Sequence, residues 1–148
     1  GQTLHMTQRY TLYAGHRDVE VDIRIDGASP DATFCTGIQK LERHSTGFMQ
    51  EDGLCGSWGN NVPEKSTPEH DEWVGLGLYT DKACRKEMKE DEFNYLTLLG
   101  TDADKPIRYY ITVCARREKD GFKNSKAWFD YLRLWKTELD SPCTVSIR

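Results

Sequence analysis

DVEVDIRID, residues 18–26, alternates strictly between apolar and charged side chains. Valine or isoleucine occupies every second position from Val19 to Ile25, and Asp, Glu or Arg fills the positions between them. A period of two places the apolar side chains on one face of a β-strand and the charged ones on the other. Such a strand belongs to an antiparallel sheet that is covered on one face only. This stretch therefore predicts an antiparallel β-fold.

The segments around this stretch extend the prediction. The preceding run, LHMTQRYTLYA (residues 4–14), also alternates, and the short turn at residues 14–17 predicts that the two runs form an antiparallel hairpin. The turn TDADKP (residues 101–106) predicts a second hairpin, between the strands on either side of it. Further strands are predicted over residues 33–41, 73–80, 93–100 and 107–115.

One helix is expected near the end of the chain, over NSKAWFDYLRLWKTEL (residues 124–139). Asn124 or Ser125 can cap its start, and apolar residues recur at steps of three and four. Trp128 and Trp135 lie on that apolar face and are predicted core residues. CTVSIR (residues 143–148) is a candidate final strand. The fold prediction is an all-β antiparallel sandwich with one C-terminal helix, as a single domain over residues 1–148.

Length and composition limit the class of protein. The chain has 148 residues, about one domain by the usual size range, and a net charge of −4, which disfavours nucleic acid as a partner. No apolar run approaches the roughly 20 residues that cross a bilayer, so no membrane span is predicted. The five cysteines are an odd number, so at least one has no partner within the chain, and cysteine content does not identify the compartment. The start at Gly1, without Met or signal sequence, suggests a processed or trimmed product.

No cofactor or metal motif is recognisable. The sequence contains no phosphate-binding loop, dinucleotide-binding fingerprint or zinc-protease motif. Gly75 and Gly77 lie within a strand pattern, which favours a bulge or a close backbone approach over a phosphate loop. Glu69 to Glu72 (EHDE) is a weak metal candidate, because consecutive residues of an extended chain point to opposite sides.

The connection LCGSWGNNVPEKSTPEHDEW (residues 54–73) is predicted to be a long loop that carries a binding site. The indole rings of Trp58 and Trp73 can stack on the apolar face of a sugar, with hydrogen bonds from nearby polar side chains. The alternative is that Trp58 is a packed loop anchor. The polar candidates for sugar binding are Arg43, Asn60 and Asn61.

Candidate catalytic groups follow from the same region. His44 and His70 are possible bases because imidazole titrates near neutral pH, whereas His16 lies in a predicted turn and is given no role. A tyrosine, Tyr109 or Tyr110, is the candidate acid. A carboxylate pair for hydrolysis is the other option, drawn from Glu69, Asp71 and Glu72.

The chain resembles a known family in several stretches. PIRYYITVCARREKDGFKNSKAWFDYL (residues 106–132) is similar to the ending of domain of unknown function 4861, a family of secreted bacterial proteins. TGIQKL, GSWGNN and WVGLGLY match its middle section in order and spacing, and RYTLYAGHRDVEVDIRI resembles the hairpin of mutarotase-like and polysaccharide-lyase domains. The chain departs from the family at Cys114-Ala115-Arg116, where many members have Gly-Trp.

The resemblance implies a supersandwich-like β-fold, export to the periplasm or beyond, and a role in polysaccharide breakdown. Full members are longer, so it also implies that this chain is the C-terminal part of one. The functional expectation is a carbohydrate-active or carbohydrate-binding protein with an oligosaccharide or polysaccharide ligand. The alternative is a non-catalytic accessory domain that docks on an upstream domain or associates with a second copy.

Overall fold

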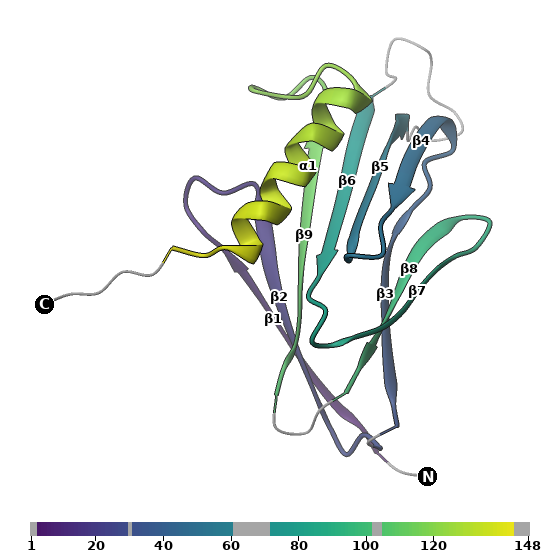
Figure 1. Ribbon diagram of the computed structural model, residues 1–148, viewed down its shortest axis with the longest axis vertical. Helices are drawn as coiled ribbons and strands as arrows, with labels where there is room; N and C mark the ends of the chain where they lie inside the picture. Colours follow the sequence, from purple (N-terminus) through teal and green to yellow (C-terminus); the bar gives the residue numbers. More distant parts are fainter. Residues whose placement is uncertain (1–2, 30, 61–71, 102–104, 144–148) are drawn as a thin grey trace, which may run out of the picture.

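The computed structural model describes residues 3–29, 31–60, 72–101 and 105–143, and within them the chain forms strands and one helix (Figure 1). The elements are β1 (His5–Leu12), β2 (Asp18–Asp26), β3 (Thr33–Gln39), β4 (Arg43–Met49), β5 (Leu54–Asn60), β6 (Trp73–Thr80), β7 (Arg85–Glu90), β8 (Asn94–Gly100), β9 (Ile107–Ala115) and α1 (Ser125–Asp140).

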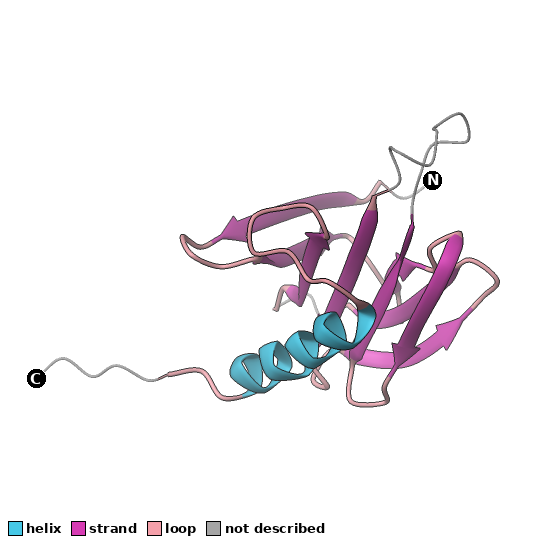
Figure 2. Cartoon of the chain, turned by 90° about the horizontal axis from the view of Figure 1, so that it is seen from above, coloured by secondary structure: helices cyan, strands magenta, loops and turns pink. Residues whose placement is uncertain are grey.

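The strands form two antiparallel sheets. The larger has six strands in the order β1-β2-β9-β6-β5-β4, and the smaller has three in the order β3-β8-β7. The two sheets face each other, and α1 lies against the outer face of the larger one (Figures 1 and 2). The predicted all-β antiparallel sandwich with one C-terminal helix is confirmed.

The hairpin predicted from the alternating stretch is confirmed. β1 pairs with β2 without interruption from His5 opposite Asp26 to Leu12 opposite Val19. Gly15, in the turn between them, has φ +82°, a backbone conformation that glycine adopts without strain.

The second predicted hairpin is wrong. β8 and β9 follow one another in sequence, but β8 lies between β3 and β7 in the small sheet, and β9 lies between β2 and β6 in the large one. Sequence proximity favours pairing. Here, however, Leu99 of β8 and Tyr109 of β9 both lie in the core between the sheets, so the two strands contribute to it from different sheets. Strands β4 and β7 were not predicted, because neither RHSTGFM nor RKEMKE has the apolar alternation of a half-buried strand.

The core between the sheets is built by the apolar faces of both. From the large sheet, Val21, Ile23, Leu78 and Tyr109 are buried there, and Leu99 of β8 packs against them from the small sheet. The apolar positions of the alternating stretch thus point toward the second sheet, as their period of two requires.

A second apolar cluster lies between α1 and the outer face of the large sheet. Trp128, Leu132 and Trp135 of the helix are all buried there, which confirms the predicted core role of the two tryptophans. Asn124 caps the helix, because its side chain accepts a hydrogen bond of 3.0 Å from the backbone N–H of Ala127.

Glycines in the sheet let the helix come close. A Cβ placed on Gly75 would lie 2.6 Å from the Trp128 ring, and one on Gly77 would lie 2.5 Å from the side chain of Leu132. Gly56 of the next strand is equally close to Leu132, at 2.7 Å. The prediction of a close backbone approach at Gly75 and Gly77 is therefore confirmed.

The predicted long loop at residues 54–73 is wrong over its first part. Leu54–Asn60 is β5, a buried strand between β4 and β6. Its glycines are typical of a loop, but in the structure Gly56 lets α1 pack closely and Gly59 lets the backbone around Arg43 come close. Residues 61–71, and the proposed final strand beyond Cys143, lie outside the described residues. No helix in the described ranges is long and apolar enough to cross a membrane.

Candidate functional site

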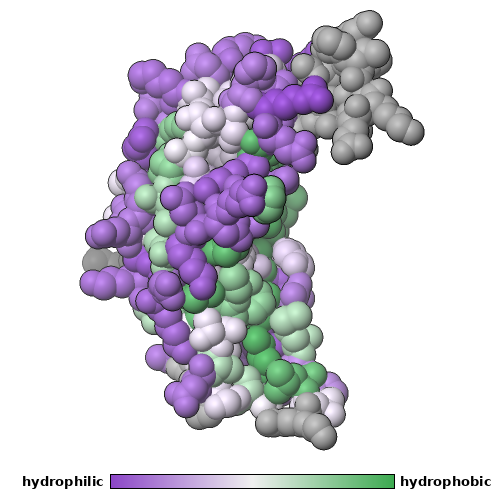
Figure 3. Space-filling model, turned by 90° about the vertical axis from the view of Figure 1, so that its right-hand side faces the viewer, coloured by the Kyte–Doolittle hydropathy of each residue, from purple (hydrophilic) through white to green (hydrophobic). Residues whose placement is uncertain are grey.

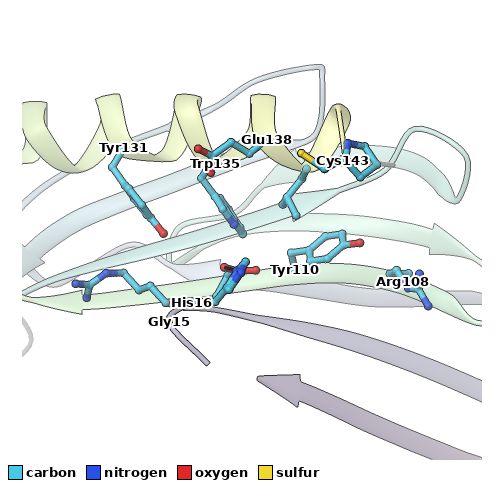
Figure 4. A pocket seen from close by; sticks show the side chains of 12 residues that line it. Gly15, His16, Arg108, Tyr110, Tyr131, Trp135, Glu138 and Cys143 are labelled. Atoms are coloured by element: carbon cyan, nitrogen blue, oxygen red, sulfur yellow. Dashed lines mark hydrogen bonds and ion pairs between the residues drawn. The ribbon is translucent and has the colours of Figure 1, made fainter. Parts of the chain in front are cut away.

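A groove of about 1060 Å³ runs beside the C-terminal half of α1 (Figure 4). It exists because α1 packs on β5 and β6 and leaves the outer face of β9 and β2 open. Tyr131 and Trp135 extend from the helix toward the strand that carries Arg108 and Tyr110 (Figure 4). The turn between β1 and β2 contributes His16 to the same groove.

The outer face of the large sheet carries charged residues from β2 and β9, of which Asp18 and Arg108 line the groove. Asp22 lies opposite Arg108 and Glu20 lies opposite Tyr110 in the pairing of these strands, so all four side chains share the outer face of the sheet. Asp18 is on this face too, and both aspartates are buried. The charged face of the alternating stretch is therefore a partly buried row of carboxylates rather than a fully solvated surface.

Arg108 is held rigidly by two of these carboxylates. Its Nε donates to Asp22 Oδ1 at 2.8 Å and its Nη2 to Asp22 Oδ2 at 3.3 Å, and Glu20 lies 3.7 Å away. Arg9 of β1 also pairs with Asp22. The guanidinium of Arg108 holds the pKa of Asp22 below its ordinary value, so this carboxylate stays ionised.

Tyr110 lines the groove from β9. Its hydroxyl donates to Glu20 Oε2 at 3.5 Å, and its ring stacks on Tyr79 at a centroid distance of 6.3 Å. It also lines two adjoining hollows, one beside Cys84 and one beside Lys136. Burial, followed by the charge of Glu20, raises the pKa of Tyr110, so its hydroxyl stays protonated and remains a proton donor at neutral pH.

His16 belongs to this groove although the sequence suggested no role for it. Its Nδ1 lies 3.3 Å from Asp18 Oδ1, and its ring meets Tyr13 edge-on at 5.8 Å. A buried carboxylate that contacts an imidazole nitrogen orients the ring. On the helix side, burial raises the pKa of Tyr131.

Three of the predicted site residues come together elsewhere, in a hollow of about 320 Å³ near the start of α1. His44 stacks on Trp73 with ring centroids 5.7 Å apart, and Trp58 stacks on Trp73 at 6.2 Å. Arg116 lies over the Trp73 ring at 5.5 Å. Trp58 is only 3% exposed, so its ring supports Trp73 from below while His44 and Trp73 reach the surface.

The backbone at His44 is unusual. Its φ of +51° lies in the left-handed region, and the pairing of β4 with β5 shifts register between Arg43 and Thr46. A non-glycine residue in this conformation stores strain and is often found at functional sites. The bulge turns the His44 side chain to the ring stack of Trp73.

The other predicted site residues are dispersed. Arg43 is exposed and lies opposite Asn60, which is buried and whose Oδ1 has no hydrogen-bond partner among the described residues. Tyr109 is buried in the core between the sheets, so Tyr110 alone of the two tyrosines faces the groove. Glu72 accepts a hydrogen bond from the backbone N–H of Arg117. The predicted residues that lie outside the described ranges are Asn61, Glu69, His70 and Asp71.

The groove was missed in the sequence because its polar residues are far apart in the chain. One signal was present: Asp18, Glu20 and Asp22 occupy every second position of one strand and must share a face. What the sequence does not reveal is that Arg108 and Tyr110, about ninety positions later, lie beside them. In the described part of the chain, no three His, Cys, Asp or Glu side chains are grouped closely enough to hold a metal ion.

Comparison with known proteins identifies the family. The model of a family described as domain of unknown function, DUF4861, matches residues 1–145. Neither the curated proteins nor the solved structures contain a match to this chain. Since the family model spans nearly the whole sequence, the chain belongs to the DUF4861 family.

Proposed function

We propose that this protein binds a saccharide, and that the groove beside α1 is the binding site. The observation that carries the proposal is the groove itself, about 1060 Å³ in volume, which Tyr110 lines together with charged and aromatic residues. Ligand sites in proteins usually occupy 300–1,000 Å³, so this groove has room for several sugar rings.

The lining chemistry suits a sugar. A pyranose has an apolar face that packs on an aromatic ring and a rim of hydroxyls that need hydrogen-bond partners. Tyr110 and Tyr131 are partly exposed aromatic side chains in the groove. His16, Arg108 and Glu138 supply donors and acceptors around them.

The charge distribution favours a neutral sugar over a polyanion. The two arginines of the groove already have carboxylate partners, because Arg17 pairs with Glu118 and Arg108 pairs with Asp22 and Glu20. An acidic polysaccharide would need free guanidinium groups and would be repelled by Asp18 and Glu138, which line the groove. The proposed ligand is therefore a neutral oligosaccharide.

The group best placed for chemistry on such a ligand is Tyr110. Its hydroxyl is protonated, contacts Glu20 at 3.5 Å and lies in the open groove, so it is the proposed proton donor of any reaction there. The resemblance to secreted proteins of polysaccharide breakdown supports the wider proposal of an exported bacterial protein with this role.

Calorimetric titration with neutral xylan-, mannan- and cellulose-derived oligosaccharides tests the site, with oligogalacturonate as the acidic comparison. The wild type is expected to bind a neutral ligand, and Tyr110→Ala and Tyr131→Ala each to weaken that binding roughly tenfold or more. Tyr10→Ala is the matched control, because Tyr10 is an exposed tyrosine on the opposite face of the sheet. Circular dichroism checks that each variant is folded.

Two results would contradict the proposal. Absence of binding across the whole panel removes the saccharide function. Binding that survives both groove variants but is lost in Trp73→Ala moves the site to the hollow of His44 and Trp73. The exposed apolar side chains of β1 support the alternative, an interaction domain.

A further inference from the structure

β1 is an edge strand with an exposed apolar stripe. Among the described residues it pairs with β2 on one side only, and no other described strand lies along its other edge. The apolar side chains of β1, and Leu4 just before it, are more than half exposed: Leu4 56%, Met6 53%, Tyr10 58% and Leu12 66%. These residues alternate along the strand and therefore share one face.

That face is the one that forms the core elsewhere in the sheet. Met6 lies opposite Ile25 and Tyr10 lies opposite Val21, and Val21 is completely buried between the sheets. The small sheet thus covers β2 but leaves β1 open on the same side. Apolar atoms also reach the surface between hydrophilic flanks in the lower half of the side seen in Figure 3.

Other edge strands of the sandwich are protected and β1 is not. The pairing of β4 is irregular near Arg43, and that of β7 is irregular near Arg85. The sequence of β7, RKEMKE, is also highly charged. β3 contacts β5 and β6 of the facing sheet. β1 (HMTQRYTL) has no proline, lysine or bulge over eight residues. Long, regular, apolar edge strands are the ones that pair with another chain.

We propose that β1 pairs with β1 of a second copy of this chain, antiparallel and about a two-fold axis at Gln8, which joins the two large sheets into one. A two-fold axis perpendicular to the sheet keeps the core face of both copies on the same side. Residues opposite each other must then share a face, so the axis passes through a residue and not between two residues. With the axis at Gln8, Met6 faces Tyr10 of the partner subunit and Leu4 faces Leu12 of the partner subunit.

The sequence of β1 is complementary to itself only in this register. The axis at Gln8 pairs all four apolar residues with one another and, on the other face, sets Arg9 against the partner's Thr7. An axis at Arg9 would place two arginines directly opposite each other, which is unfavourable. An axis at Thr7 would set Met6 against the partner's Gln8. The sequence of β1 therefore favours pairing with a second copy of the same strand, in one alignment.

The pairing is independent of the proposed saccharide site. The groove is lined by α1, β9 and the β1–β2 turn, and neither Met6 nor Tyr10 contributes to it. A dimer formed through β1 keeps both grooves open, and loss of the dimer leaves the groove residues in place.

Sedimentation velocity from about 1 µM to about 1 mM protein tests the proposal. The wild type is expected to dimerise. Met6→Glu and Tyr10→Lys each put a charge against an apolar partner residue twice per dimer, and each should weaken dimerisation roughly tenfold or more. The double variant, M6E/Y10K, pairs Glu with Lys across the axis and should recover most of the loss. Leu134→Glu, an exposed apolar residue on α1, is the control and should leave dimerisation unchanged.

Three results would contradict the proposed pairing. A wild type that stays monomeric over the whole range overturns the proposal. A dimer that is insensitive to the single variants has another interface. A double variant as weak as the single ones overturns the alignment at Gln8, because residues 6 and 10 face each other in no other two-fold register. Thermal unfolding of each variant confirms that the strand is still folded.

Discussion

The guanidinium of Arg108 holds Asp22 from the neighbouring strand by two hydrogen bonds, the shorter of them 2.8 Å. Asp22 is buried, and Arg108 lines the groove, so this pair positions a side chain that the groove presents. Removal of Arg108 leaves the carboxylate with Arg9 as its remaining basic partner.

Arg108→Gln should therefore destabilise the protein at neutral pH by about 1–3 kcal/mol, less than a fully buried pair because Arg108 is partly exposed. The pKa of Asp22 is lowered in the folded state, so its contribution is present above the unfolded pKa of about 4 and is lost as pH falls through the folded value. Urea titrations at pH 7 and pH 3 should show a smaller pH dependence for the variant. An equal loss of stability with acid in both proteins would contradict this.

Gly75→Ala should destabilise the fold by about 1–3 kcal/mol, because the new Cβ would lie 2.6 Å from the buried Trp128 ring. Gly100→Ala is the matched control. Its Cβ would meet only the flexible end of Lys86, at 2.9 Å, which can move aside. Thermal unfolding of both variants measures the difference, and equal melting temperatures would show that α1 does not need the glycine.

Asn124→Ala should cost about 1 kcal/mol of stability, since the Asn124 side chain accepts the hydrogen bond that caps α1. Ser125→Ala, one position later, removes no capping bond and should change little. Denaturant unfolding of the two variants, followed by tryptophan fluorescence, gives the comparison. A greater effect at Ser125 would place the cap one residue later.

The cysteines should differ sharply in reactivity. Burial raises the pKa of Cys55 and of Cys114 to about 12, so neither forms a thiolate readily in the folded protein. Cys35 and Cys143 are exposed and should react first with a thiol reagent at pH 8. Cys84, half-buried and with a raised pKa, should follow more slowly.

Mass spectrometry after brief labelling identifies the modified residues, and labelling in guanidinium chloride should modify all five. Rapid modification of Cys55 or Cys114 in the native protein would contradict the packing of the two apolar clusters.

Local sequence patterns predicted part of this fold well. The period of two in residues 18–26 predicted β2, its pairing with β1 and its apolar face. The period of three to four in residues 124–139 predicted α1 and its buried tryptophans. Both patterns are visible because each element buries one face, and the burial repeats with the geometry of the element.

The candidate site was predicted less well. His44, Trp58 and Trp73 do lie together, because β4, β5 and β6 are neighbours in the sheet. Yet Trp58 was predicted to lie in a loop. The glycines that suggested this loop are explained by close packing, of α1 at Gly56 and of the backbone near Arg43 at Gly59. Strand order placed Tyr110 in a different hollow from the other predicted residues.

By itself, the sequence determined the strand and helix type of its strongly periodic segments and the class of the fold, because those depend on contacts between residues near in the chain. Only the tertiary structure decided that β8 and β9 part into different sheets and that Arg108 meets Asp22. It also decided that α1 covers two strands and leaves a groove over two others. These features arise from contacts between residues far apart in the chain, which no local period encodes.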